Sequence, residues 1–458
     1  MPGLRGRAGR AGTSAVVRRR RRAVTAARRP ADLVDGYVGL VTDLVQVPVG
    51  AADPAVHVVG GRVADLGCYG VDVTAEINGS GAGMTLAEAT SAAVGESFER
   101  YACCFPLSGG LIPGSYADLR DRAEADPVEP GRWALFERDQ QVPFPHFDEQ
   151  TPLTWVTGWS LTRQRARLVP ACLVYFGPDA DLRPDGCVTI APAVSTGAAC
   201  DSTSTGATVR GLLELIERDA VLIHWRNRIT PRRLRIDPAC ALAGDYTDVF
   251  ARPGLHYELY DVSLDLPVTA VFGTLTDERR NPPAVFAAGA AHPDPETAVR
   301  KTLVELVQGL RWGDQTTGRT VEPLPGFANI RTFEDRMRLY SGNDLSEAFA
   351  FLQSSPASLD LSSVARSGEP TIDVLGRLVA GLADRDLEVI AVDITTDDLA
   401  ECGVVVVKTL VPGLTTMEGD HTAPFLGGRR WRRLPVELGL LDREREPAEL
   451  NPYPHPYP

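Results

Sequence analysis

The sequence predicts an α+β fold in which mixed β-sheets pack against helices. From about Val34 onward, short runs rich in β-branched residues alternate with polar segments, which is typical of strands separated by turns. Three longer segments carry apolar residues every three or four positions, the spacing of one helix face. Together these patterns favour sheets covered by a few long helices. The strand-like runs are GYVGLVTDLV, LVPACLVYFG, PVTAVFGTL, DLEVIAVDIT and GVVVVKTLV.

The first helical segment is MTLAEATSAAVGESFERYA. Thr85 and Glu88 stand in T-x-x-E spacing, so each side chain can accept a hydrogen bond from the other residue's backbone N–H as a capping box. This pattern predicts a helix from about residue 86 to residue 102.

The second and third helical segments are TGATVRGLLELIERDAVLIHW and DPETAVRKTLVELVQGLRW. In the third, Asp294 is a favoured capping residue, and Pro295 takes the first helical position, where its missing N–H costs nothing. Each segment has an apolar face that should be buried. The faces consist of Val209, Leu212, Leu213, Ile216, Ala220 and Ile223 in the second segment and Val299, Leu303, Leu306 and Leu310 in the third.

Charge and proline content divide the chain into three parts. Residues 1–33 are expected to form a basic, disordered arm, since the first thirty residues hold ten arginines and no acid. We interpret the arm as a dispensable extension; the alternative is a flexible contact to nucleic acid or to an acidic partner. Residues 34–444 are expected to form the folded domain. Residues 445–458 form a tail that ends in NPYPHPYP and favours a stiff polyproline II conformation.

Composition disfavours several classes of protein. The chain of 458 residues carries a net charge of −13, and this acidity disfavours nucleic-acid binding by the body. No apolar run reaches the roughly 18 residues of a membrane-spanning helix. The eight cysteines form no C-x-x-C pair, which argues against a zinc site or a disulfide framework and favours the reducing cytoplasm. Lysine occurs only at positions 301 and 408, and neither a P-loop nor a dinucleotide-binding fingerprint is present.

The three helical segments repeat one polar device in their second halves. Residues three positions apart share a helix face, and an arginine four positions after the first glutamate can brace that carboxylate. On one helix this would be an ordinary ion pair, but three repeats on largely apolar helices favour a site. Buried carboxylates must be paired or bind metal, and carboxylate oxygens are the ligands that Mg²⁺ prefers. We therefore expect a magnesium–nucleotide site without a P-loop. The devices are Glu96, Glu99 and Arg100; Glu214, Glu217 and Arg218; and Glu305 with Gln308.

Two further segments precede the first two helices, the Gly-rich NGSGAGMT and the hydroxyl-rich VSTGAACDSTSTG. Backbone N–H groups at the start of a helix favour phosphate binding. We expect both segments to be loops, and either could contact the nucleotide.

In this order, GAGMTLAEATSAAVGESFERY, STGAACDSTSTGATVRGLLELIERDA, GAAHPDPETAVRKTLVELVQ and the PYPHPYP end resemble the YcaO family. The branch that the chain is most similar to forms azoline rings in ribosomally synthesised peptides, and the resemblance runs from about Tyr37 to Pro458. It implies a catalytic YcaO-like domain over residues 34–444 with ATP and Mg²⁺ as cofactors. The implied nucleotide contacts are Ser91, Glu96, Glu99, Arg100, Glu214, Glu217, Arg218, Glu305 and Gln308, and the implied metal ligands are Glu96, Glu99, Glu214, Glu217 and Glu305.

The resemblance also implies a reaction. The side chain of a Cys, Ser or Thr in the substrate attacks the preceding backbone carbonyl, the oxyanion takes the γ-phosphoryl group of ATP, and phosphate leaves as the thiazoline or oxazoline closes. The Pro-rich tail would belong to the active site, with the terminal carboxylate of Pro458 orienting substrate or acting as a base. This chain departs from the family pattern at Ala82, Ala92 and Gly206, where the family often has a basic residue, a serine and a glutamate.

Two alternatives remain open: thioamide or amidine formation by the same amide activation, and a non-catalytic subunit that binds the precursor. The implied partners are a ribosomal precursor peptide and a separate E1-like, ThiF-like or leader-recognition protein. An FMN-dependent dehydrogenase would be needed for azole products of the bacteriocin or thiopeptide kind. Neither a membrane nor nucleic acid is expected as a partner, and a homodimer is compatible with the sequence, which leaves the oligomeric state undecided.

Overall fold

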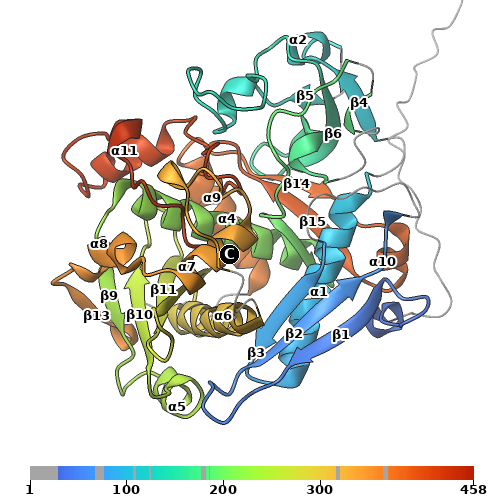
Figure 1. Ribbon diagram of the computed structural model, residues 1–458. Coiled ribbons are helices and arrows are strands. Elements are labelled where there is room, and N and C mark those ends of the chain that lie inside the picture. The colour runs from blue at the N-terminus through green and yellow to red at the C-terminus, as the bar shows by residue number, and fades with distance from the viewer. Residues whose placement is uncertain are drawn as a thin grey trace, which may run out of the picture.

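Three β-sheets organise the part of the chain that is described by the computed structural model (Figure 1). That part comprises residues 29–67, 77–106, 110–122, 125–176, 182–184, 186–315, 320–364 and 370–457. The predicted α+β class is confirmed. Two of the sheets are mixed, because β13 runs parallel to β9 and β5 runs parallel to β7, while the other pairings between the strands of these sheets are antiparallel.

Within each sheet, neighbouring strands are hydrogen-bonded in the following order. The three-stranded sheet is β1 (Val41–Val47), β2 (His57–Val63) and β3 (Gly79–Gly83). The five-stranded sheet is β12 (Ala284–His292), β11 (Thr269–Asp277), β10 (Leu255–Asp261), β9 (Arg232–Arg235) and β13 (Ser358–Asp360). The seven-stranded sheet is β5 (Asp126–Pro127), β7 (Arg165–Pro170), β6 (Leu153–Ser160), β14 (Ile390–Asp393), β15 (Val405–Leu410) and β8 (Ala198–Asp201), with β4 (Leu111–Gly114) also paired to β6.

Three long helices and several short ones pack on these sheets. The long helices are α1 (Leu86–Cys104), α4 (Ser204–Asn227) and α6 (Pro295–Gln315). The shorter ones are α2 (Tyr116–Leu119), α5 (Leu242–Asp245), α7 (Phe333–Gly342), α8 (Ala350–Gln353), α9 (Thr371–Ala383), α10 (Asp397–Glu401) and α11 (Arg430–Glu437). None of the helices in the described residues combines the length and the apolar character needed to cross a membrane.

The predicted helix starts are confirmed in atomic detail. The Thr85 side chain accepts from the Glu88 N–H at 3.2 Å and the Glu88 carboxylate accepts from the Thr85 N–H at 3.1 Å, so α1 begins with the expected capping box. Asp294 accepts from the Thr297 N–H at 2.9 Å and caps α6 at Pro295. These contacts form within four residues of chain, which is why their pattern can be read from the sequence.

Two runs in the sequence take a different structure from the expected one. Only the first part of LVPACLVYFG is a strand, since β7 ends at Pro170, whose missing N–H cannot extend the ladder. NGSGAGMT was expected to be a loop, but Gly79–Gly83 forms strand β3. Its glycines are needed because α1 lies directly on it: a Cβ at Gly81 would collide with the backbone N of Ala93. Likewise, Ala198–Asp201 forms strand β8 rather than a loop.

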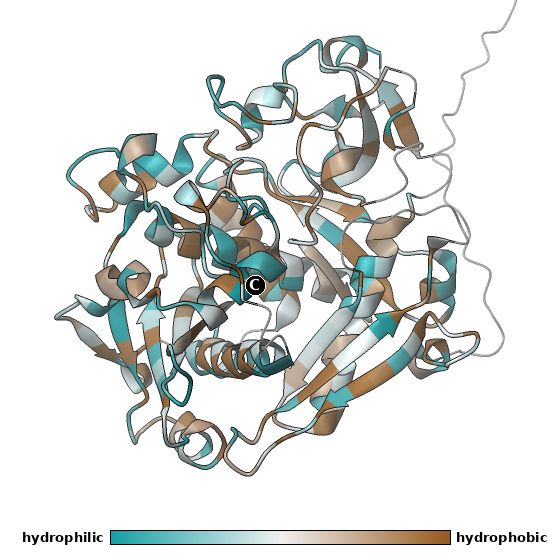
Figure 2. Cartoon of the chain, in the orientation of Figure 1, coloured by the Kyte–Doolittle hydropathy of each residue, from teal (hydrophilic) through white to brown (hydrophobic). Residues whose placement is uncertain are grey.

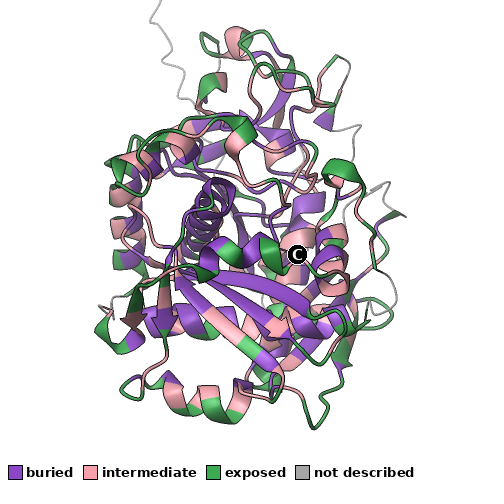
Figure 3. Ribbon diagram, turned by 60° about the vertical axis from the view of Figure 1, so that its left-hand side comes forward, coloured by how far each residue is buried: buried purple, intermediate pink, exposed green. Residues whose placement is uncertain are grey.

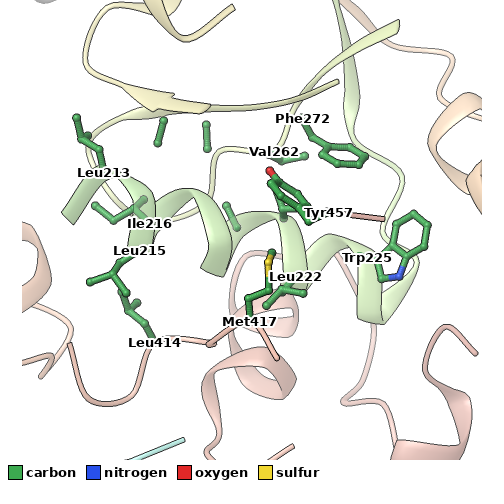
Figure 4. Close-up of a cluster of buried hydrophobic side chains, with 14 of the residues drawn as sticks. Leu213, Leu215, Ile216, Leu222, Trp225, Val262, Phe272, Leu414, Met417 and Tyr457 are labelled. Carbon is green, nitrogen blue, oxygen red and sulfur yellow. The ribbon is translucent and has the colours of Figure 1, made fainter. Parts of the chain in front are cut away.

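The main core lies around α4, which is buried along nearly its whole length (Figure 3). The predicted apolar faces are confirmed, since every residue named for α4 and α6 is buried. In Figure 2, hydrophobic and hydrophilic residues alternate along α6, whose apolar side packs on β11 and β12. Figure 4 shows the core along α4, into which Tyr457 of the C-terminal tail inserts beside Phe272.

The ends of the chain fit the predicted division only in part. Residues 1–28 of the expected arm lie outside the described residues. Pro30–Leu33 forms a 3₁₀ helix, and Leu33 packs against the buried hydrophobic cluster that contains Val41, Phe98 and Val156. The folded domain therefore extends into the range expected for the arm, because Leu33 has apolar surface to bury.

Candidate active site

Glu96 lies in α1 and connects three elements. Its carboxylate forms an ion pair with Arg100 at 2.7 Å and also accepts a hydrogen bond from the backbone N–H of Ser80 in β3. The hydroxyl of Ser80 in turn accepts from Nε2 of Gln308 in α6 at 2.6 Å. The braced carboxylate predicted on the first helix is therefore confirmed. Ser80, the second residue of β3, therefore connects α1 to α6 through these two hydrogen bonds.

Glu99, three residues further along α1, contacts β8. Its Oε1 accepts from the backbone N–H of Cys200 at 2.8 Å. Burial, together with the nearby carboxylates of Glu96 and Glu214, raises the pKa of Glu99 to about 8 against the lowering effect of the Cys200 hydrogen bond. In a site without a bound cation, this carboxyl is therefore largely protonated at neutral pH.

Glu214 is the first glutamate of α4. It accepts from the backbone N–H of Gly197 at 2.9 Å, and Arg218 lies 3.7 Å away. Beside it, Lys408 of β15 is buried and donates from Nζ to the carbonyl oxygens of Val194 and Thr196. Burial lowers the pKa of Lys408, while its attraction to Glu214 opposes this effect. Both lysines of the chain thus act on glutamates of the cluster, since Lys301 also lowers the pKa of Glu305.

Glu217 is the most deeply buried of these glutamates, with 7% of its surface exposed. Its Oε1 accepts from the phenol of Tyr457 at 3.0 Å and lies 3.4 Å from Nε of Arg218. Burial raises the pKa of Glu217 to about 8; Arg218 lowers it, and Glu305 and Glu214 raise it. The guanidinium of Arg218 lies 4.5 Å from the centre of the Tyr457 ring, a cation–π contact.

Glu305 in α6 completes the set. Burial raises its pKa to about 7, Lys301 and Arg218 lower it, and Glu214 and Glu96 raise it. Carboxylates on α1, α4 and α6 therefore act on one another electrostatically, although they come from segments about a hundred residues apart. The convergence of the three glutamate-bearing helices, which the sequence predicted, is confirmed as a placement; the roles of these residues remain a prediction.

The C-terminal tail reaches this cluster along α4. The phenol of Tyr340 donates to the carbonyl of Pro454 at 2.6 Å, and the indole of Trp225 donates to the carbonyl of Tyr453 at 3.1 Å. His455 is buried against the backbone carbonyl of Glu418 at 2.9 Å. Each residue of the tail from Pro454 to Tyr457 is buried. A segment with few N–H donors can be buried at low cost in this way, because few of its polar groups need partners.

Two predicted site residues have no contact to the cluster among the described residues. Ser91 is exposed on α1, and five residues of helix place it about 140° around the axis from Glu96. Ser91 therefore lies on a different face of α1 from Glu96, and its role as a nucleotide contact stays a prediction. Pro458, expected to supply a catalytic carboxylate, lies outside the described residues.

The expected cage of carboxylates is not formed by the side chains as they lie. Among the described residues, no three His, Cys, Asp or Glu side chains are grouped so that they could hold a metal ion by themselves. The reason is local, since four of the five glutamates each accept from a backbone N–H or the Tyr457 phenol. The oxygen-only donor set still fits Mg²⁺, which commonly takes one or two carboxylates together with phosphate oxygens and water.

Sequence reasoning missed three residues that the structure brings to the cluster. Tyr457 lies in the PYPHPYP end, where the alternation of ring-bearing residues with proline is the pattern that could have singled it out. Ser80 sits inside the Gly-rich segment and connects Glu96 to Gln308. Lys408 could have been singled out because lysine is so rare in this chain.

Comparison with known structures shows the same fold. A heterocyclase solved in complex with substrate and cofactor matches 93% of this chain with a TM-score of 0.72 and 22% identity. This chain spans 56% of that heterocyclase. YcaO from Methanopyrus kandleri, solved with AMPPCP and Mg²⁺, matches 84% of this chain and 88% of its own length, with a TM-score of 0.58 and 22% identity. The E. coli microcin synthetase McbBCD complex contains a chain that matches 90% of this chain and 96% of its own length, with a TM-score of 0.58 and 14% identity.

The sequence itself carries the family match. Residues 80–415, nearly three quarters of the chain, match the family described as YcaO cyclodehydratase, ATP- and Mg²⁺-binding. The matched region contains α1, α4 and α6 with all of their glutamates. The expectation of ATP and Mg²⁺ as cofactors is thereby confirmed at the level of the family. The chain belongs to the YcaO family.

Proposed function

We propose that this chain is an ATP-dependent cyclodehydratase that acts on a ribosomally made precursor peptide. It would convert Cys, Ser or Thr residues into thiazoline or oxazoline rings during the biosynthesis of a bacteriocin-like or thiopeptide-like product. The observation that carries the proposal is the contact of Tyr457 with both Glu217 and Arg218. It brings the end of the chain to the glutamate helices, where a terminal carboxylate can take part in chemistry on a substrate.

The residues of the cluster suit the binding of a magnesium–nucleotide complex. When bound, Mg·ATP supplies the phosphoryl group that makes an amide oxygen a good leaving group. The carboxylates of Glu217 and Glu305, whose pKa values lie above their ordinary range, would ionise and hold the metal. Arg100 and Arg218 lie beside Glu96 and Glu217 and would offset the charge of the phosphates.

The tail would position the reacting groups. Pro458 follows Tyr457, whose phenol donates to Glu217, and we propose that the carboxylate of Pro458 enters the same site. There it would orient the attacking side chain of the substrate or accept its proton. We expect that a C-terminal tag abolishes ring formation and leaves peptide binding and the thermal midpoint nearly unchanged. Deletion of Pro456–Pro458 should also abolish ring formation, and it should lower the thermal midpoint because it removes the buried Tyr457. Full ring formation by the truncated chain would refute this role.

Phosphate release separates an enzyme from a non-catalytic precursor-binding subunit. The assay combines purified protein, precursor peptide and partner protein, and compares the wild type with Glu217→Gln. We expect peptide-dependent phosphate release by the wild type only. Equal phosphate release by both proteins, or no release by either, would contradict the proposal that the chain is an enzyme.

Mass spectrometry of the peptide then separates the reactions that activate an amide. Ring closure removes one water per modified residue, whereas thioamide formation exchanges oxygen for sulfur. An azole product would require two further hydrogens to be removed by an FMN-dependent dehydrogenase. We propose that a separate E1-like, ThiF-like or leader-recognition protein delivers the peptide; the occurrence of a relative in the McbBCD complex supports such an assembly.

A further inference from the structure

Strand β8 ends between α1 and α4, the two helices that carry four of the five glutamates. The thiol of Cys200 lies 3.5 Å from the carbonyl of Gly95 in α1, and its backbone N–H donates to Glu99 of the same helix. The next residue, Asp201, turns its side chain to the opposite side of the strand, towards the first turn of α4. Its Cα is at most about 8 Å from Oε1 of Glu99. Asp201 thus adds a carboxylate close to the cluster that does not belong to the glutamate pattern of the helices.

The carboxylate of Asp201 fills the space beside Gly206 in the first turn of α4. A Cβ built on Gly206 would lie 2.4 Å from Cγ of Asp201 and 2.5 Å from its Oδ1, closer than a real Cβ approaches other heavy atoms. Gly206 is also one of the positions at which this chain departs from the family pattern, since the family often has a glutamate there. The chain therefore has no carboxylate on residue 206 and holds one from residue 201 directly beside it.

Position 206 belongs to a stripe of α4 that leads to the cluster. Residues four positions apart are neighbours on a helix surface, so the stripe consists of Gly206, Arg210, Glu214 and Arg218. Exposure falls along it, since the side chain of Arg210 is 67% exposed, that of Glu214 30% and that of Arg218 21%. A ligand that reaches Glu214 from solvent along this stripe passes Asp201 and Arg210 first.

Asp201 and Arg210 form an ion pair whose two charges match a metal–phosphate complex. Nε of Arg210 lies 3.1 Å from Oδ2 of Asp201, while Oδ1 accepts from the N–H of Thr203 at 3.2 Å. Ion pairs with an exposed arginine contribute little to stability, so Arg210 can leave Asp201 at low cost. A carboxylate oxygen is a ligand that Mg²⁺ prefers, and a guanidinium binds phosphate oxygens. Both residues can therefore exchange each other for one part of a bound magnesium–nucleotide complex.

We propose that Asp201 is a further oxygen donor to the Mg²⁺ of the bound nucleotide and replaces the glutamate that is absent from position 206. Arg210, released from Asp201, binds phosphate oxygens of the same complex. The inference deepens the proposed function and rests on its magnesium–nucleotide site. It assigns part of that site to the end of a strand, whereas the glutamates come from helices.

Calorimetric titration of the full-length protein with AMPPCP, a non-hydrolysable ATP analogue, in Mg²⁺ and in EDTA tests this assignment. We expect Asp201→Asn to weaken binding about tenfold in Mg²⁺ and not to weaken it in EDTA, because only the metal requires the carboxylate. Asn keeps an oxygen that can accept from Thr203, so the start of α4 is retained. The matched control is Asp360→Asn, which breaks an ion pair with Arg235 on the five-stranded sheet and should leave both affinities unchanged.

Moving the carboxylate to position 206 provides a second test. Asp201→Gly should weaken Mg·AMPPCP binding as Asp201→Asn does. The double variant Asp201→Gly/Gly206→Glu should restore the affinity to within about threefold of the wild type, because a carboxylate returns to a space that Asp201 no longer fills. Gly206→Ala alone should lower the thermal midpoint through its collision with Asp201, and the midpoint should recover in Asp201→Gly/Gly206→Ala.

Three results would overturn the inference and leave the proposed function intact. The first is equal binding of Mg·AMPPCP by the wild type and Asp201→Asn. The second is a loss in Asp201→Asn that is as large in EDTA as in Mg²⁺, which would show a structural role only. The third is no recovery of affinity in Asp201→Gly/Gly206→Glu. Absence of Mg·AMPPCP binding by the wild type would overturn both the inference and the nucleotide site on which it rests.

Discussion

Replacing Glu99 with Gln tests the electrostatics of the cluster most directly. The amide oxygen of Gln can still accept from the N–H of Cys200, so the packing and this hydrogen bond are retained while the ionisable group is lost. Burial raises the pKa of Glu99 from 4.5 to about 8, which means that the folded protein holds the proton more tightly than the unfolded chain does. The stability that this group contributes is therefore fully present below pH 4.5 and is lost as the pH rises through 8.

The size of the effect follows from these two pKa values. Keeping Glu99 ionised in the folded state costs about 5 kcal/mol at alkaline pH, and about 3 kcal/mol of that cost develops between pH 6 and pH 9. For a chain of this length, 1 kcal/mol corresponds to about 1 °C in thermal midpoint. The midpoint of Glu99→Gln should therefore rise relative to that of the wild type by about 3 °C across this pH range.

Thermal unfolding at several pH values, with and without Mg²⁺ and a non-hydrolysable ATP analogue, measures both consequences. Without ligand, the variant should become increasingly more stable than the wild type as the pH rises. With ligand, the wild type should gain stability and the variant should gain less, because it has lost a charge that the metal complex would neutralise. Glu322→Gln, at an exposed position outside the cluster, is the control and should follow the wild type in both series.

Two outcomes would refute this reasoning. Parallel midpoint curves for the wild type and Glu99→Gln would show that burial does not raise the pKa of Glu99. A full ligand-induced shift in Glu99→Gln would show that this carboxylate has no part in binding the metal–nucleotide complex.

Three further substitutions test the packing and the tail. Tyr457→Phe keeps the ring against Phe272 but removes the donor to Glu217. We expect turnover in the phosphate-release assay to fall about tenfold with little change in thermal midpoint. Unchanged turnover would mean that this hydrogen bond does not contribute to the reaction. Gly81→Ala should destabilise the fold by about 1–3 kcal/mol in urea unfolding, because the new Cβ would collide with the α1 backbone. Gly131→Ala is the control and should not destabilise the fold, since its Cβ would face open space. Equal effects of the two substitutions would count against the close packing of β3 on α1. Asp294→Ala should cost about 1 kcal/mol by the same measurement and Asp294→Asn much less, and equal losses would exclude a capping role.

The helices and their polar faces could be predicted because their causes are local. The capping contacts of Thr85 and Asp294 span three residues, and residues three positions apart share a helix face whatever surrounds it. The glutamate devices could therefore be assigned to three helices from spacing alone. Their convergence could be expected from the repetition, since isolated buried carboxylates on apolar helices would be costly.

Long-range packing decided the rest. Gly79–Gly83 is a strand rather than a loop because it pairs with β2 while α1 packs against it, and nothing in the neighbouring residues reports either contact. Ser91 is exposed on a different face of α1 from Glu96, whose carboxylate accepts from Ser80 of β3. The sequence by itself determined which side chains each helix presents. Which donor each carboxylate receives, such as the Tyr457 phenol at Glu217 from 240 residues away, was decided only by the tertiary structure, since such contacts depend on how distant segments pack.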